Sequence, residues 1–273
     1  MYDDTIDGFV KAANAKLDHL RLAPHSFFIS CMLAGAYIGL GIILIFALGS
    51  HLAPDIRPLV MGLTFGIALI LVVIAGAELF TGHTMVMTLR RYRGQGSWAD
   101  AATVLCVSWA GNLCGAAVLV GLFVMGGGGG LLSDPNGPLM AAAVAKMNAG
   151  AASLFARAVL CNWLVCLAIW MSARVSSDSA RCIVIGWCLL TFIASGYEHS
   201  VANMTVLLLA LAGHHPDSVS LSGMLWNLSW VTLGNLVGGA ICVAGAYGIS
   251  SSRRASLNTH GTTPNPDTPA ARS

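Results

Sequence analysis

A glutamate and a histidine lie next to each other in the middle of an otherwise apolar stretch of the chain. Glu198 and His199 fall between two apolar pieces, CIVIGWCLLTFI and VANMTVLLLALA. Ionisable residues at membrane depth are rare, and they usually mark an ion or proton pathway. Because the unperturbed pKa of histidine is about 6.5, a modest local field decides whether its ring is charged. The pair therefore points to proton transfer or to a charged hydrogen bond with a substrate.

A second polar interruption is expected in the segment GAELFTGHT, residues 76–84, which contains Glu78, Thr81 and His83. The Thr81 hydroxyl, and backbone N–H groups freed by a break in a helix, can donate hydrogen bonds to substrate oxygens. An ionised glutamate only accepts them, so Glu198 is better suited to supporting neighbouring groups than to binding an anion. A purely structural role for Glu198, through Asn162, stays open, and His83 is given no role.

The cost of moving charge through an apolar passage limits the chemistry further. Transferring a bare monovalent anion to low dielectric costs on the order of 20 kcal/mol in the idealised limit. A passage with apolar walls must therefore pair the anion with a fixed cation or neutralise it with a proton. His199 could do either. Anions of weak acids accept a proton readily and chloride does not, so a proton-donating centre would favour weak-acid anions.

The composition requires a membrane around most of the chain. Of the 273 residues, 56% are hydrophobic and only 10% are charged, whereas soluble domains carry about 25% charged residues. All eight cysteines lie within apolar runs and none forms a CxxC pair. They are predicted to be small apolar core residues rather than metal ligands or disulfides. We expect no metal, no cofactor, no nucleic-acid partner and no enzymatic activity.

Hydropathy predicts an all-α integral membrane protein with six transmembrane helices. A spanning helix needs roughly 20 apolar residues, and five stretches satisfy this: 26–49, 58–77, 101–125, 151–173 and 223–249. The stretch 182–212 is predicted to cross once, with a polar break near the bilayer centre. The remaining segments are residues 1–25, an amphipathic cytoplasmic helix on the membrane surface or a solvated cap, and residues 250–273, a disordered cytoplasmic tail.

The distribution of basic residues orients these crossings. With a cytoplasmic N-terminus, the outside keeps only Arg57, Lys146 and Arg157. The inside then holds the other eleven: Lys11, Lys16, Arg21, Arg90, Arg91, Arg93, Arg174, Arg181, Arg253, Arg254 and Arg272. Such a bias is typical of cytoplasmic loops. The sequence therefore predicts a multi-pass membrane protein with both termini in the cytoplasm.

An internal repeat divides the chain into two halves. The motif GNLxG occurs at Gly111–Gly115 and again at Gly234–Gly238, 123 residues later, in the third and sixth predicted spans. Since each half has three spans, the halves must have opposite orientations, which places a substrate path near the midplane between broken helices. By this symmetry, the break near 194–200 predicts another near 78–84, and we expect the two to meet beside one pore.

Four segments of the chain resemble the formate/nitrite transporter family. They are AGAYIGLGIILI at 34–45, GAELFTGHT at 76–84, LCNWLVCLAIWM at 160–171 and SGYEHSVANM at 195–204. The resemblance covers about residues 1–249 and is closest to the nitrite-channel branch. It implies an aquaporin-like fold of six helices in two inverted repeats, with helices two and five broken, assembled as a homopentamer with one pore in each protomer.

The resemblance also implies a set of pore residues. His199 matches the central pore histidine and Thr81 its neighbour, while Glu198, Asn162 and Asn203 match the polar residues that hold this centre. The apolar constrictions would be Phe65, Leu69 and Phe192 on one side of His199, and Leu79, Phe80 and Val165 on the other.

Nitrite or a similar small monovalent anion is the expected substrate. Lys146, just before the fourth span, is expected to attract anions to the outer pore mouth; a lysine that only contacts lipid headgroups is the alternative. A formate or hydrosulfide channel of the same fold stays open, because the residues do not rank these anions. A haem-bearing membrane oxidoreductase is a remote alternative, since it would need paired histidines on facing helices.

Overall fold

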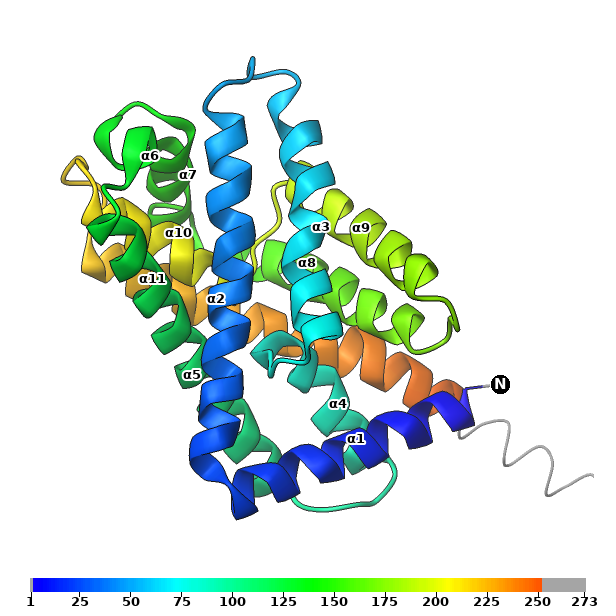
Figure 1. Ribbon diagram of the computed structural model, residues 1–273. Helices are drawn as coiled ribbons and strands as arrows, with labels where there is room; N and C mark the ends of the chain where they lie inside the picture. The colour runs from blue at the N-terminus through cyan, green and yellow to red at the C-terminus, as the bar shows by residue number, and fades with distance from the viewer. Residues whose placement is uncertain (1, 252–273) are drawn as a thin grey trace, which may run out of the picture.

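The computed structural model describes residues 2–251, and this part of the chain is helical throughout, with no β-strand. Figure 1 shows the arrangement. The helices are α1 (Asp3–Leu22), α2 (Pro24–Gly49), α3 (Arg57–Ala75), α4 (Phe80–Tyr92), α5 (Trp98–Met125), α6 (Gly129–Ser133), α7 (Pro138–Met147), α8 (Ala151–Ser172), α9 (Asp178–Ala194), α10 (Ser200–Ala212) and α11 (Leu221–Val237), which continues through the π-helical stretch η1 (Gly238–Gly245). The predicted tail from residue 252 on lies outside the described residues.

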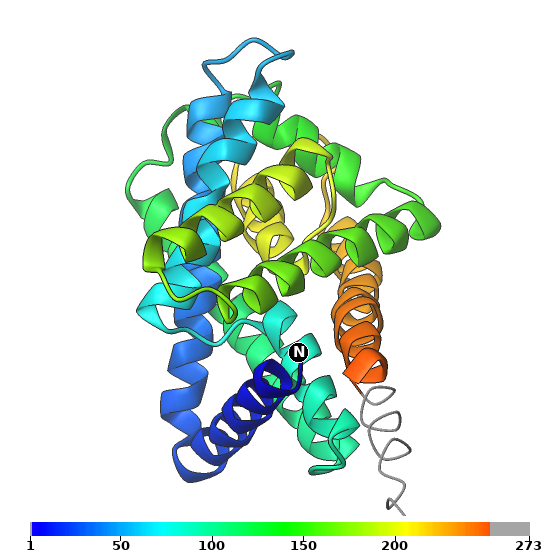
Figure 2. The ribbon, with the colours of Figure 1, turned by 90° about the vertical axis from the view of Figure 1, so that its right-hand side faces the viewer.

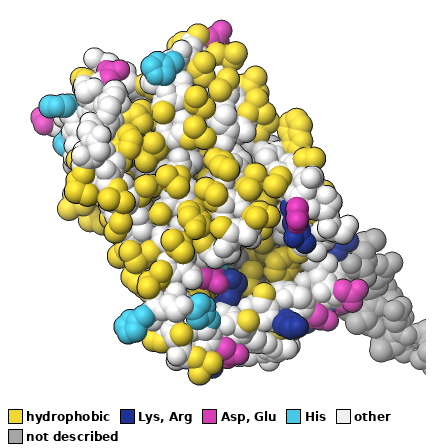
Figure 3. All heavy atoms as spheres, in the orientation of Figure 1, with side chains coloured by type: hydrophobic (Ala, Val, Ile, Leu, Met, Phe, Trp, Pro, Cys, Tyr) yellow, Lys and Arg dark blue, Asp and Glu magenta, His cyan; other side chains and the backbone are white. Residues whose placement is uncertain are grey.

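Within residues 2–251, five helices are long and apolar enough to cross a membrane. They are α2, α3, α5, α8 and the helix from Leu221 to Ser251 that includes α11 and η1. Apolar side chains cover the face over α2, α3 and α5, whereas charged side chains gather at the end that carries α1 (Figure 3). A broad apolar band of this kind is what lipid contact requires. The chain is therefore a multi-pass membrane protein.

Two short interruptions separate helices that follow one another in sequence. Helix α3 ends at Ala75 and α4 begins at Phe80, while α9 ends at Ala194 and α10 begins at Ser200. Each interruption contains a glycine with positive φ, 78° at Gly76 and 68° at Gly196, a conformation that other residues adopt only with strain. The first interruption thus covers residues 76–79 rather than the expected 78–84.

Helix α1 lies across the end of the molecule formed by α2, α4 and α5 (Figures 1 and 2). Its apolar side, including Ile6, Val10, Ala13 and Leu17, is buried against the rest of the chain. Phe9 stacks on Trp170 of α8 with ring centroids 5.7 Å apart. The protein itself, and not lipid, therefore buries the apolar face that the sequence pattern predicted.

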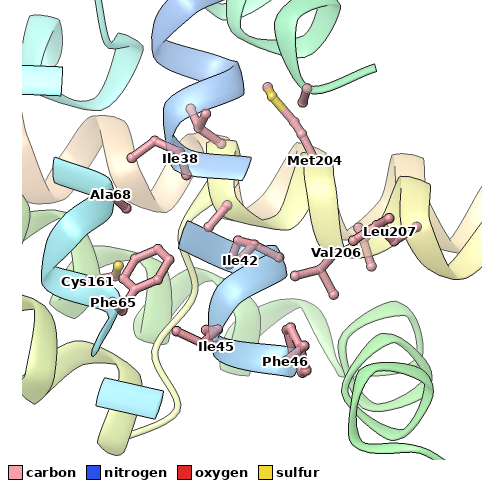
Figure 4. Close-up of a cluster of buried hydrophobic side chains, with 14 of the residues drawn as sticks. Ile38, Ile42, Ile45, Phe46, Phe65, Ala68, Cys161, Met204, Val206 and Leu207 are labelled. Atoms are coloured by element: carbon pink, nitrogen blue, oxygen red, sulfur yellow. The ribbon is translucent and has the colours of Figure 1, made fainter. Parts of the chain in front are cut away.

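The main apolar core lies among α2, α3, α9 and α10 (Figure 4). In it, Ile42 of α2, Phe65 of α3 and Val206 of α10 are all buried. Close helix contacts depend on small residues: a Cβ at Gly35 would overlap the backbone of Asn112 on α5. Figure 2 shows α8 and α9 side by side, crossing in front of α10. These contacts fix the ends of α4 and α10, where the polar residues gather.

Candidate functional site

His199 directly precedes α10 as its N-cap, and it contacts α4 through Thr81. Its Nδ1 accepts a hydrogen bond from the backbone N–H of Ala202 at 3.1 Å, as an N-terminal helix cap. Its Nε2 lies 3.2 Å from the Oγ1 of Thr81 on α4. Both side chains are buried. The starts of α4 and α10 therefore meet at one hydrogen bond.

These contacts determine the protonation state of the His199 ring. An Nδ1 that accepts from a backbone N–H must keep its lone pair, so the proton of the neutral ring sits on Nε2. The Nε2–H then donates to Thr81 Oγ1, which leaves the threonine hydroxyl hydrogen free for another acceptor. Charging the ring would require breaking the cap of α10. The geometry thus favours a neutral histidine that donates one hydrogen bond.

Asn112, in the first GNLxG motif, holds the start of α4 in place. Its Oδ1 accepts from the backbone N–H of Phe80 at 2.9 Å. Its Nδ2 donates to the carbonyl oxygens of Cys31 at 2.7 Å and Glu78 at 3.0 Å. The amide therefore satisfies the free N–H at the start of α4 and the carbonyl of Glu78 in the break, groups that would be costly to bury without partners, and its contact with Cys31 ties both to α2.

Asn235, in the second GNLxG motif, makes the same three kinds of contact at the start of α10. Its Oδ1 accepts from the backbone N–H of Ser200 at 2.8 Å. Its Nδ2 donates to the carbonyl oxygens of Ala158 at 2.8 Å and Glu198 at 3.0 Å. The repeated motif thus has a repeated function: each of the two asparagines, here called the clamping asparagines, anchors one short helix.

A polar cluster lies beside His199 on the side that carries α7. The Oε2 of Glu198 accepts from Lys146 Nζ at 3.0 Å and from Asn203 Nδ2 at 2.6 Å. Asn227 of α11 extends the cluster, since its Oδ1 accepts from Asn203 at 2.9 Å and its Nδ2 donates to the Lys146 carbonyl at 3.0 Å. Lys146, Asn203 and His199 line a cavity of about 130 Å³, here called the α7-side vestibule.

A matching cluster lies on the side that carries α1. The Oε2 of Glu78 accepts from Lys16 of α1 and lies 2.6 Å from His83 Nε2. These three residues and Leu79 line a cavity of about 320 Å³, here called the α1-side vestibule. Glu78 and His83 each precede Glu198 and Asn203 by 120 residues. Each vestibule thus holds a Lys–Glu ion pair.

Asn162 of α8 holds the centre together, but not through Glu198. Its Nδ2 lies within hydrogen-bond distance of the carbonyls of Thr81 at 3.2 Å and Asn235 at 2.6 Å, and of Thr84 Oγ1 at 2.9 Å. The expected pinning of Glu198 through Asn162 is therefore wrong: Lys146 and Asn203 contact that carboxylate instead. Asn162 fixes the first two turns of α4 against α11.

Apolar side chains enclose the His199–Thr81 contact. Phe192 stacks on the His199 ring with centroids 5.9 Å apart and meets Phe65 edge-on at 5.4 Å. All six residues expected to form constrictions are buried within the same apolar cluster: Phe65, Leu69, Leu79, Phe80, Val165 and Phe192. Phe192 borders the α7-side vestibule, and Leu79 borders the α1-side one.

The sequence pointed to most of this site, Lys146 included, but missed two contributors, Lys16 and Asn227. Lys16 was counted only for its charge, because nothing in a sequence shows that α1 folds back to Glu78. Asn227 carries no repeat signal. Lys146 was expected at an open pore mouth, yet it is ion-paired with Glu198 and lies within α7. Among residues 2–251, no group of three or more His, Cys, Asp or Glu side chains is placed to hold a metal ion.

Comparison with known proteins gives consistent matches. A sequence model described as formate/nitrite transporter matches residues 3–249. The nitrite transporter NirC of Salmonella typhimurium is 51% identical over 249 residues, covering 90% of this chain and 91% of the relative. A solved FNT family ion channel is 49% identical with a TM-score of 0.89, over 91% of this chain and 99% of that one. A solved pentameric formate channel with formate bound is 29% identical with a TM-score of 0.73, over 85% and 99%.

Proposed function

The chain belongs to the formate/nitrite transporter family, and from this premise we propose that it is a channel for nitrite or a similar small weak-acid anion. The observation that carries the proposal is the buried His199–Thr81 contact, enclosed by apolar side chains and flanked by two vestibules that each hold a Lys–Glu pair. A channel that had to conduct fully hydrated ions would not need such an apolar enclosure.

The crossings are proposed to number six, in two inverted halves. Helices α3 and α4 form the second crossing and α9 and α10 the fifth, each broken at its positive-φ glycine. The matching contacts of Asn112 and Asn235 support an inverted repeat. Trp109 Nε1 also donates to Thr232 Oγ1 at 3.0 Å, and these two residues occupy the same position relative to GNLxG in the two halves.

Permeation is proposed to begin at Lys146. The ammonium attracts the anion into the α7-side vestibule, where the low dielectric strengthens the attraction. There the anion accepts a proton from hydronium of the vestibule water, which becomes water, and it crosses the apolar passage as the weak acid. His199 remains neutral and, through the free hydroxyl hydrogen of Thr81, offers a hydrogen bond at the narrowest point. This replaces the idea that the His199 ring itself supplies the proton.

In this scheme, the channel excludes chloride because of its charge and not because of its size. Phe65, Phe192 and Leu79 cannot replace the hydration of a charge, so an ion that stays charged faces a large desolvation barrier. Nitrous and formic acids are neutral once protonated, whereas chloride stays charged near neutral pH. The distinction is one of basicity, and for that reason formate and hydrosulfide are possible substrates of the same site.

The proposed membrane, orientation and oligomeric state rest on the family and on the placement of charged residues. We propose a bacterial inner membrane with α1 and both termini in the cytoplasm, because the basic residues gather on the α1 side. One solved relative is described as pentameric, and a homopentamer is proposed for this chain too.

Uptake into proteoliposomes tests the function. Vesicles holding a pH-sensitive dye are given nitrite, formate, hydrosulfide or chloride under matched gradients. We expect nitrite to enter with a proton and chloride to enter at least about tenfold more slowly, the equivalent of 1.4 kcal/mol. Rapid formate or hydrosulfide entry without nitrite entry would reassign the substrate. Equal rates for chloride and nitrite would overturn the proposal.

The same vesicles test Lys146. Lys146→Gln is expected to lower nitrite entry more at low salt than at high salt, because screening shortens the field of the ammonium. The double variant with Glu198→Gln is the control, since it removes the unpaired carboxylate that the single variant leaves. If the double variant recovers wild-type entry, Lys146 only neutralises Glu198 and does not attract the anion.

A further inference from the structure

His83 is a buried histidine of the α1-side vestibule that the proposed permeation path does not use. It lies on α4, two residues after Thr81, and only 2% of its surface is exposed. It lines the cavity together with Glu78 and Lys16. Its Nε2 contacts Glu78 Oε2 at 2.6 Å, whereas its Nδ1 has no hydrogen-bond partner among the described residues. A buried polar nitrogen without a partner is uncommon and calls for an explanation.

The contact with Glu78 defines what this nitrogen can do. A carboxylate only accepts hydrogen bonds, so Nε2 carries the ring proton and donates it, and Nδ1 of the neutral ring retains a lone pair. The same carboxylate stabilises the imidazolium that forms when Nδ1 takes a proton, as in carboxylate-oriented histidine bases. In contrast to His199, whose Nδ1 caps a helix, His83 can gain a proton without losing a hydrogen bond.

The repeat supplies an internal comparison. Asn203 occupies the corresponding position in the other half and donates to Glu198 at 2.6 Å. An amide can hold the carboxylate in place, but it cannot bind a proton at neutral pH. Glu78 and Glu198 are therefore both held by a side-chain N–H from this position. The residue there is titratable only in the α1-side vestibule.

The surroundings of His83 contain charges of both signs. Phe27 of α2 stacks on its ring, with centroids 6.2 Å apart, and His19 of α1 meets the same phenylalanine edge-on. The titratable or charged groups on the elements packed around it are Glu78, Lys16 and His19 of α1, Cys31 of α2, Cys166 of α8 and Cys242 of η1. Glu78 is the carboxylate that touches the ring, and it balances a proton there.

We propose that the Glu78–His83 pair is the proton-exchange site of the α1-side vestibule, an inference that rests on the proposed function. A weak acid leaving the apolar passage transfers its O–H proton to His83 Nδ1: the O–H bond breaks, an N–H bond forms, and no group is oxidised or reduced. The released anion stays next to Lys16, and the imidazolium next to Glu78. Vestibule water then removes the proton and restores the neutral ring. Flow in the opposite direction reverses each step.

His83→Asn is the direct test, because it installs the residue that the other vestibule already uses. The amide can still donate to Glu78 but cannot exchange a proton. We expect proton entry coupled to nitrite to fall by about tenfold or more, and its dependence on the pH of the α1 side to flatten. The variant is measured in right-side-out and inverted vesicles, with the exposed face identified by protease access to a tag on the N-terminus.

Two further variants keep the test decisive. His83→Gln, whose longer amide also donates, repeats the measurement if the asparagine variant does not assemble. His51→Asn removes an exposed histidine outside both vestibules and should change neither rate nor pH profile. A His83→Asn channel with wild-type coupled flux and an unchanged pH profile would overturn this inference but not the proposed function. If wild-type vesicles pass no weak acid, the proposed function fails instead.

Discussion

At the scale of single residues, the same side-chain type serves different purposes according to which atom is already occupied. His199 uses Nδ1 to cap α10 and is left with one donor at Nε2. His83 uses Nε2 toward Glu78 and is left with one acceptor at Nδ1. Both residues are visible in the sequence, but their roles depend on which nitrogen is free, and no sequence pattern specifies this.

A pair of substitutions at His199 separates a hydrogen-bond donor from a proton donor. His199→Asn keeps a side chain that caps helices well and can donate an N–H, whereas His199→Ala keeps neither function and should cost about 1 kcal/mol of stability through the lost cap. We expect the asparagine variant to retain most nitrite entry together with its proton. The alanine variant should lose nitrite entry and reject chloride less well.

Dye-monitored pH and anion flux in proteoliposomes provide the measurement. If His199→Asn moves nitrite but no longer moves a proton with it, the ring is a proton donor and the neutral assignment is wrong. Thermal unfolding of both variants serves as the control for folding.

At the scale of elements, the helix boundaries show where sequence patterns succeed and where they fail. Hydropathy located the long helices, since a lipid-facing helix needs a continuous apolar run. The break before α10 was also anticipated, because Glu198 and His199 interrupt the apolar run. The break before α4 was expected near 78–84 but covers 76–79, because Asn112, distant in sequence, fixes the first N–H of α4 at Phe80.

The glycines at these breaks can be tested with a matched control. A Cβ at Gly76 or Gly196 would meet nothing within 4 Å, so only the positive φ opposes alanine there. Gly76→Ala and Gly196→Ala should each destabilise the protein by about 1–2 kcal/mol. Gly121→Ala in α5, where a Cβ is equally unhindered and φ is helical, should stabilise it slightly.

Thermal unfolding in detergent provides this measurement. Equal midpoints for all three alanine variants would show that the two breaks do not depend on a left-handed glycine.

At the scale of the whole molecule, the two ends of the described chain meet at α1. Ser251 Oγ donates to the Asp3 carboxylate, and Arg93 Nη2 contacts it at 2.8 Å. These contacts lower the pKa of Asp3 from 3.8 to about 2. The hydrogen bond from Ser251 has the largest effect, and the contacts with Arg93 follow. The amphipathic pattern predicted α1, but its docking site could not be predicted because its partners come from distant parts of the chain.

The Asp3 contacts predict acid-sensitive docking of α1. Because the pKa of Asp3 is lower when α1 is docked, these contacts stabilise docking fully above about pH 4. This stabilisation is lost as the pH falls toward 2. Amide hydrogen exchange in α1 should therefore quicken over this range, beyond the intrinsic change measured in an unfolded peptide. Asp3→Asn should weaken the pH dependence and leave the part due to Asp100, which accepts from Arg21 of α1 at 2.7 Å. Asp4→Asn, at an exposed position of the same helix, should preserve it in full. The same curve for both variants would contradict this role.

The clamping asparagines also have a consequence for the order in which the protein is made. Asn112 follows α4 in the chain, and Asn235 follows α10, so each short helix leaves the ribosome before the side chain that anchors it. Until then, a free N–H at the helix start and the carbonyl of Glu78 or Glu198 in the break must stay hydrated or be shielded during insertion. The starts of α4 and α10 can therefore become fully stable only when α5 and α11 arrive, and a nascent chain ending before α11 would leave the start of α10 without its anchor.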